Sequence, residues 1–158
     1  MPKRNRNAPA FTLPADDGTT VSLAGLKGRT VVLFFYQKDG SPGCTQEACE
    51  FSERLPRFTQ SGAVVLGISP DSPRKHANFS AKYALPFRLL SDADRVVCER
   101  YGVWKEKLFW GRKYMGVERS TFIIDARGKL VREMRKVSHA GHAEDVAKAV
   151  RELAARRR

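Results

Sequence analysis

The pattern of apolar and polar residues along this chain predicts both strands and helices. Short continuous apolar runs indicate buried strands, and apolar residues that recur every three to four positions indicate helices. Residues 30–36 and 63–68 are apolar on both faces, as the central strands of an α/β sheet are. Further strands are predicted at 11–13, 20–23, 87–90, 120–125 and 130–135, the last two as a hairpin. Apolar residues at helical spacing predict helices after Ser41, after residues 69–73, at 93–101 and at 142–155. Strands alternating with helices predict an α/β layered domain, and the closing hairpin indicates a mixed sheet.

The length of 158 residues is enough for one domain with a core and too short for two. We therefore expect a single domain over residues 1–158, with short basic unpacked ends near 1–8 and 156–158. No apolar run is long enough to cross a bilayer, and no apolar segment of signal-peptide length follows the basic N-terminus. The chain is accordingly expected to stay in the cytoplasm and to have no membrane partner.

The net charge of +12 fits either a solvated basic surface or a polyanion partner such as nucleic acid. The basic residues are scattered, and no aromatic-interleaved stripe or nucleic-acid motif accompanies them. We favour the solvated surface and expect no specific nucleic-acid partner. A nucleic-acid binding module stays open as an alternative.

The cysteines are the first candidates for chemistry, and there are three of them: Cys44, Cys49 and Cys98. An odd number without a secretory signal leaves redox chemistry, metal binding or plain burial. Cys44 follows a buried strand and lies in the first turn of a helix, with Ser41 as N-cap and Pro42 at the first helical position. Backbone N–H groups and the helix dipole stabilise a thiolate there, and the thiolate is the form that attacks a peroxide O–O bond. Gly43 lets backbone and substrate come close.

Cys49 lies five residues after Cys44 in the same predicted helix. In an α-helix this separation places the two Cα atoms about 8.6 Å apart, whereas a disulfide needs about 4.4–6.8 Å. The two cysteines therefore either form no bridge or form one only after the first turns of the helix unwind. The spacing also differs from the C-x-x-C of thioredoxin-type dithiol reductases.

The segment FFYQKDGSPGCTQEACEF, residues 34–51, resembles the active-site segment of peroxiredoxins, specifically of the PrxQ or bacterioferritin-comigratory-protein branch. The similarity continues through PFRLLSDAD and YGVWKEKLFWGRKYMGVERSTFIID, and it covers nearly the whole chain apart from the ends. The resemblance implies a thioredoxin-like fold, in which helices flank a central mixed sheet that carries an N-terminal β extension. It also implies a thiol-dependent peroxidase that reduces hydrogen peroxide and organic hydroperoxides.

The resemblance also implies a role for each matching residue. Cys44 takes the position of the peroxidatic cysteine, which becomes a sulfenic acid, and Ser41 takes the hydroxyl position before it. Cys49 takes the position of the resolving cysteine, which forms an intramolecular disulfide that thioredoxin or a similar dithiol reduces. Arg119 takes the position of the peroxide-polarising arginine, and Gln37 stands where the family has a pocket-shaping proline.

A pocket for the peroxide is expected around three residues of the active-site segment, namely Gln37, Pro42 and Gly43. The implied reaction needs no cofactor, because no metal, haem or flavin takes part in it. An intramolecular bridge requires no partner subunit, and we therefore expect a monomer.

Two further interpretations stay open. One is a thioredoxin-like disulfide reductase, which the five-residue cysteine spacing and Arg119 oppose. The other is a metal site that combines Cys44 and Cys49 with a histidine, and the candidates are His76, His139 and His142. The remaining residues of note are assigned to packing (Cys98, Trp104, Trp110) or to a solvated helix face (Glu47, Glu50).

Overall fold

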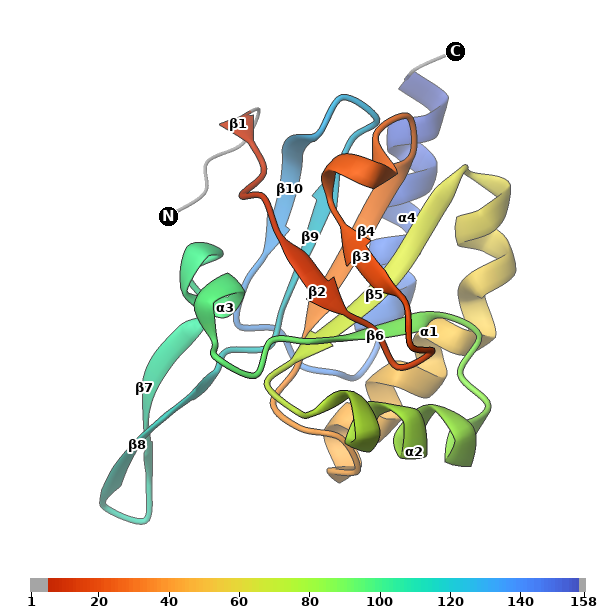
Figure 1. Ribbon diagram of the computed structural model, residues 1–158. Helices are drawn as coiled ribbons and strands as arrows, with labels where there is room; N and C mark the ends of the chain where they lie inside the picture. Colours follow the sequence, from red (N-terminus) through yellow and green to blue (C-terminus); the bar gives the residue numbers. More distant parts are fainter. Residues whose placement is uncertain (1–5, 157–158) are drawn as a thin grey trace.

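A computed structural model describes residues 6–156 and gives them a layered α/β fold (Figure 1). The main sheet of this part of the chain has six strands, in the order β1 (Arg6–Asn7), β10 (Lys129–Met134), β9 (Ser120–Ile124), β4 (Thr30–Phe35), β5 (Ala63–Ser69) and β6 (Arg88–Ser91). β4, β5 and β6 run parallel, whereas β9 pairs antiparallel with both β4 and β10. The sheet is therefore mixed, which confirms the predicted fold class.

Different elements cover the two faces of this sheet (Figure 1). One face carries α1 (Pro42–Gln60) and α4 (His142–Arg156), which an ion pair between Arg57 and Glu144 joins at 2.7 Å, while α2 (Pro73–Tyr83) lies near β6. The other face carries the N-terminal extension and one short helix, namely β2 (Thr12–Pro14), β3 (Thr20–Ser22), η1 (Ala24–Leu26) and α3 (Val96–Arg100). None of the described helices is long and apolar enough to cross a membrane.

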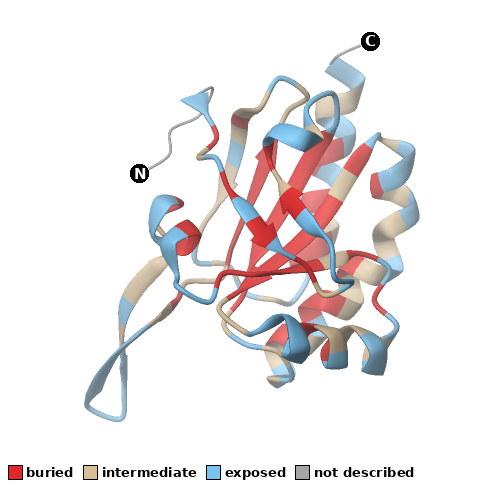
Figure 2. Ribbon diagram, in the orientation of Figure 1, coloured by how far each residue is buried: buried red, intermediate tan, exposed pale blue. Residues whose placement is uncertain are grey.

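The strand β4 contributes to both cores, because successive side chains of a strand point to opposite faces. Phe34 points toward α1, where its ring stacks on Phe51 with 4.6 Å between centroids. Phe35 points to the opposite face and contacts the rings of Tyr101 and Phe122. Figure 2 shows that buried residues run along the central strands. The end of β4 is thus packed on both sides, and the loop that follows starts from a fixed point.

A second hairpin, β7 (Trp104–Phe109) and β8 (Arg112–Val117), extends away from the layered body (Figure 1). The sequence pattern does not predict it, because its outer half is exposed on both faces and shows no alternation of buried and solvated positions. Trp104 is half-buried, but Trp110 lies at the turn and is 90% exposed. The prediction that Trp110 serves packing is therefore wrong.

The described residues nearest the two ends, 6–8 and 156, are more ordered than predicted. Arg6 and Asn7 pair with β10, and Ala8 is buried, so the expectation of an unpacked end over residues 1–8 is wrong for 6–8. At the other end α4 continues through Arg156. Residues 1–5 and 157–158 of the predicted unpacked ends lie outside the described residues.

Helix α1 continues past Pro56 to Gln60, although a proline removes one helical hydrogen bond. Phe51 and Phe58 lie on either side of this proline, and both are fully buried. Their packing offsets the lost hydrogen bond and fixes the second half of the helix against the sheet.

Candidate active site

The first turn of α1 carries the thiol of Cys44 at its third position, and this side chain is 1% exposed. Ser41 has the extended backbone of an N-cap, and its carbonyl accepts from the Thr45 N–H at 2.8 Å. Pro42 occupies the first helical position, as predicted. The Ser41 side chain does not cap the helix, because its hydroxyl donates to the Lys38 carbonyl at 3.3 Å. Cys44 therefore lies where backbone N–H groups lack helical partners.

Two side chains from other parts of the chain contact this thiol. Cys44 Sγ donates to Gln37 Oε1 at 3.1 Å. Arg119, from the turn between β8 and β9, places Nη2 2.8 Å from the same oxygen and 3.3 Å from Sγ. A guanidinium in this position can stabilise negative charge on the sulfur and on a peroxide oxygen beside it. The structure thus brings together three residues that the sequence singled out.

Glu47 belongs to this site, and its assignment to a solvated helix face is wrong. Its side chain is fully buried, and Oε1 accepts from Arg119 Nη1 at 2.6 Å. Burial raises the pKa of Glu47 to about 7, although the Arg119 charge acts in the opposite direction. Glu47 lies three residues after Cys44, and this spacing places two side chains on one helix face. That spacing was the signal in the sequence that could have identified it.

A cavity of about 540 Å³ opens beside Gln37 and Arg119. The β7–β8 hairpin forms another of its walls through Lys107, Leu108 and Tyr114. Burial lowers the pKa of Lys107, and the positive charge of Arg119 lowers it further. The cavity therefore combines positive charge near the thiol with apolar side chains on the hairpin side.

Gly43 is needed for close packing next to the thiol. A Cβ at this position would lie 3.0 Å from His139 Cδ2 and 3.4 Å from Arg119 Nη2. The close backbone approach predicted at Gly43 is therefore made to these two side chains. His142 lies deeper, with Nε2 2.7 Å from Thr121 Oγ1, and burial lowers the pKa of His142 to about 4.

The other two cysteines differ in their surroundings. Cys49 is half-buried in the intact helix α1, and burial raises its pKa, with a further contribution from the charge of Glu53. Cys98 is fully buried in the core on the opposite side of the sheet from Cys44, and burial raises its pKa strongly. The packing predicted for Cys98 is confirmed. A bridge between Cys98 and Cys44 would have to cross the sheet.

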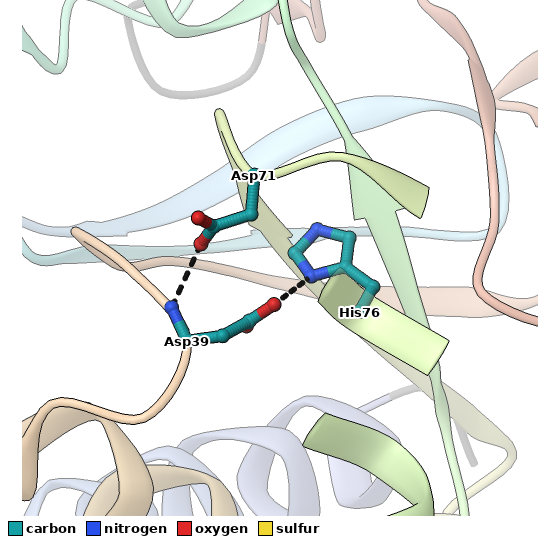
Figure 3. A group of neighbouring side chains, drawn as sticks. All are labelled: Asp39, Asp71 and His76. Carbon is teal, nitrogen blue, oxygen red and sulfur yellow. Dashed lines mark hydrogen bonds and ion pairs between the residues drawn. The ribbon is translucent and has the colours of Figure 1, made fainter. Parts of the chain in front are cut away.

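Asp39 ties the active-site loop to the body of the protein (Figure 3). Its carboxylate lies 2.6 Å from His76 Nδ1 and accepts from the Tyr36 hydroxyl at 2.6 Å, while its backbone N–H donates to Asp71 Oδ2 at 2.7 Å. His76 is fully buried, and its Nε2 donates to the Leu90 carbonyl at 3.0 Å. The loop that carries Gln37 is thereby fixed to α2 and to the ends of β5 and β6.

The same three residues are the candidates for a metal site in the described part of the chain. Among the His, Cys, Asp and Glu side chains of residues 6–156, one group could hold a metal ion. It consists of Asp39, Asp71 and His76, whose possible ligand atoms lie within 4.8 Å of one another. All three are already hydrogen-bonded within the protein, which fits an anchor for the loop. The metal alternative combined Cys44 and Cys49 with a histidine, and no such group forms in the described part of the chain.

Comparison with known sequences agrees with this geometry. The model of the AhpC/TSA family matches residues 5–133. The chain is 50% identical over 141 residues to a putative peroxiredoxin bcp of Coxiella burnetii, covering 89% of this chain and 93% of the relative. It is 44% identical over 148 residues to peroxiredoxin Bcp of Bacillus subtilis, covering 94% of each.

Solved structures of peroxiredoxins of the same branch are similar to this chain. The bacterioferritin comigratory protein of Xanthomonas campestris, a protein studied for alkyl peroxide reduction, superposes with a TM-score of 0.90 at 40% identity. That match covers 96% of this chain and 99% of the other. A cysteine-to-serine mutant of Xylella fastidiosa PrxQ superposes with a TM-score of 0.92 at 35% identity, over 98% of both chains.

Proposed function

Because the chain belongs to the AhpC/TSA family, and within it to the PrxQ/BCP peroxiredoxins, we propose that its thiol-dependent peroxidase reaction runs through Cys44 and Cys49. The family membership establishes the activity, and the roles of single residues are the proposal. One contact carries it: Arg119 Nη2 lies 3.3 Å from the sulfur of a cysteine in the first turn of a helix.

In the first step the Cys44 thiolate attacks one oxygen of the hydroperoxide. A sulfur–oxygen bond forms while the O–O bond breaks, and the thiol is oxidised to a sulfenic acid. The other oxygen leaves as hydroxide or alkoxide and takes up a proton to give water or an alcohol. Arg119 stabilises the charge that moves from sulfur to the leaving oxygen, and Glu47 holds the guanidinium in place through Nη1.

In the second step Cys49 attacks the sulfenic sulfur of Cys44. The S–S bond forms, and the sulfenic hydroxyl leaves as water once it has taken up a proton. The first turns of α1 unwind for this step, because the intact helix separates the two Cα atoms by about 8.6 Å. Unwinding also exposes Cys49 and removes the burial that raises its pKa, so the attacking thiolate forms at the moment it is needed.

The catalytic cycle closes when a thiol reductant cleaves the disulfide by exchange. We propose thioredoxin or a similar dithiol as this reductant, and hydrogen peroxide and organic hydroperoxides as substrates. The alkyl peroxide reduction described for the Xanthomonas campestris relative supports the organic substrates. We further propose a monomer, because a bridge between two cysteines of the same chain needs no partner subunit. We also propose a location in the cytoplasm, and we propose no specific nucleic-acid partner because the basic residues are scattered along the chain.

The test treats the reduced protein with one equivalent of hydrogen peroxide and maps disulfides by peptide mass spectrometry. We expect a Cys44–Cys49 bridge in the unaltered protein and a trapped sulfenic acid on Cys44 in Cys49→Ser. Cys98→Ser is the matched control and should react as the unaltered protein does, because Cys98 is buried beyond the sheet. A Cys44 that stays a free thiol would refute the proposal, and a bridge to Cys98 would replace the resolving residue.

A further inference from the structure

The tip of the β7–β8 hairpin carries large apolar side chains that the described part of the chain leaves uncovered. Leu108, Phe109 and Trp110 follow one another and are 70%, 64% and 90% exposed, and Tyr114 and Met115 are also exposed. Among residues 6–156, Val96 is the only exposed large hydrophobic residue outside this hairpin. We call residues 108–115 the hairpin tip. Figure 2 shows it as an exposed projection from the body.

The apolar side chains of the hairpin tip point in several directions. Residues directly opposite each other in the antiparallel register share a face, and successive residues alternate. Leu108 and Met115 therefore point to one face of the hairpin, Phe109 and Tyr114 point to the other, and Trp110 lies at the turn. A flat protein surface would cover only one of these faces. A fluid medium that surrounds the tip covers all of them.

The turn itself contains a residue that its backbone does not favour. Trp110 and Gly111 have φ values of 54° and 74°, as in a two-residue type I′ turn. Such turns favour Asn, Asp or Gly at the first position, and a bulky residue with positive φ is an outlier. The turn geometry therefore does not account for Trp110, and the outlier points to a role for its exposed side chain.

Basic residues flank the apolar tip. Residues 105–115 contain four basic residues and one acidic residue, a net charge of +3, and the acidic Glu106 pairs with Lys113 at 3.7 Å. A second copy of this chain, which itself carries +12, would repel such a tip. An anionic surface would attract it.

We propose that the hairpin tip docks on the surface of an anionic lipid bilayer. Trp, Tyr and Phe concentrate at the boundary between headgroups and acyl chains, and Arg112 and Lys113 would meet the phosphates. Docking of this kind needs no membrane-spanning helix, but it does revise the expectation that the protein has no membrane partner.

Docking on a bilayer would also determine which hydroperoxides reach the active site. This part of the proposal rests on the proposed peroxidase function. Leu108 and Tyr114 belong both to the hairpin tip and to the wall of the cavity beside Arg119. A docked hairpin would hold this wall of the cavity at the bilayer surface. Hydroperoxides of membrane lipids are therefore the substrates that this geometry favours.

The experiment mixes the reduced full-length protein with vesicles of phosphatidylcholine, with and without phosphatidylglycerol, and measures binding by sedimentation and tryptophan emission. We expect binding that requires phosphatidylglycerol, with a blue shift that persists in Trp104→Phe. The double variant Phe109→Ser/Trp110→Asn should bind at least about tenfold more weakly, because it removes apolar area, and its Asn at position 110 is a residue that the turn favours. Arg112→Gln/Lys113→Gln should lose about fivefold for each charge.

Controls come from exposed positions outside the hairpin tip: Val96→Thr and Arg151→Gln should bind as the unaltered protein does. The double variant at 109 and 110 should reduce hydrogen peroxide at the normal rate in buffer and should reduce phospholipid hydroperoxide in anionic vesicles more slowly. Failure to bind anionic vesicles, equal binding by the double variant, or a hairpin-dependent self-association would each overturn the docking proposal. Vesicle binding without hydrogen peroxide reduction would instead refute the proposed function.

Discussion

At the scale of single residues, the guanidinium of Arg119 links the parts of the site. Its Nη1 donates to Glu47, and its Nη2 donates to Gln37 and contacts the sulfur of Cys44. The planar fork fixes the direction of both groups at once. A lysine offers a single charged nitrogen and cannot hold Glu47 and Cys44 in the same way.

The first prediction concerns this fork. Arg119→Lys should lower kcat/KM for hydrogen peroxide by about 10²–10³, because a donor aimed at the developing charge is lost. Stopped-flow measurement of peroxide reduction tests this, with Arg151→Lys on the exposed side of α4 as the matched control. A loss below threefold would mean that Arg119 does not act on the reacting oxygens.

The second prediction concerns the buried carboxyl of Glu47. Its pKa in the folded protein is about 7, above the ordinary value of 4.5, so between these values the folded protein keeps a proton that the unfolded chain has lost. The free energy of unfolding should therefore contain a contribution that falls as pH rises from 4.5 to about 7. Urea unfolding at a series of pH values should show this fall in the unaltered protein relative to Glu47→Gln. The exposed Glu53→Gln should leave the profile unchanged.

The positions of single residues were predicted correctly where a local sequence motif determines them. Ser41, Pro42 and Cys44 were placed by helix-start rules, and the structure has them in those positions. Arg119 lies 75 positions from Cys44, and only the family resemblance pointed to it. Glu47 was missed, because a glutamate near a helix start usually faces solvent and its burial depends on tertiary packing.

At the scale of elements, α1 has two tasks that oppose each other. In the proposed reaction it must be intact to hold the Cys44 thiol beside Arg119, and it must unwind to let Cys49 reach that thiol. Its second half is fixed by Phe51, Phe58 and the Arg57–Glu144 ion pair, so unwinding is expected only in the first turns.

The third prediction follows from this division. Oxidation to the Cys44–Cys49 disulfide should increase amide hydrogen exchange in residues 42–50 and leave 51–60 protected. Hydrogen exchange measured by mass spectrometry on the reduced and oxidised protein tests it, and peptides from α4 serve as the internal control. Unchanged protection over residues 42–50 in the oxidised protein would contradict the proposed unwinding.

The fourth prediction concerns the packing of β5 against its neighbours. A Cβ on Gly67 would lie 2.8 Å from both Leu89 Cδ2 and Phe34 Cζ, so Gly67→Ala should lower the free energy of unfolding by about 1–3 kcal/mol. Gly116→Ala is the matched control, because its Cβ would lie 3.3 Å from Lys107 Cδ and from Tyr114 Cε2, outside the core, where both side chains have room to move. Chemical denaturation of both variants measures the difference, and equal stabilities would contradict the close packing.

Elements that pack into the core were predictable from the sequence, and elements outside the core were not. β4 and β5 were recognised because a short continuous run of apolar residues is typical of a strand that is buried on both faces. β7 and β8 were missed because no core imposes a period on their outer halves. β1 is two residues long, too short for any period, and it forms only because β10 offers a free edge.

At the scale of the whole molecule, the charge of +12 opposes association between copies of the chain. The fifth prediction is a monomer of 17.7 kDa in both redox states, because the proposed Cys44–Cys49 disulfide joins two residues of one chain. Analytical ultracentrifugation of the reduced and the peroxide-treated protein tests this, with Cys49→Ser as the variant that cannot form the bridge. A disulfide-linked dimer in the treated unaltered protein would contradict it.

The N-terminal segment touches both outer edges of the main sheet. Arg6 and Asn7 pair with β10 at one edge, and further along the segment Ala15 bridges Leu90 and Asp16 bonds to the Leu89 backbone at the other (Figure 1). Exposed strand edges are templates for pairing with other chains. Deletion of residues 6–16 would therefore expose both edges at once. We expect such a deletion to favour association in which the exposed sheet edge of one copy pairs with that of another.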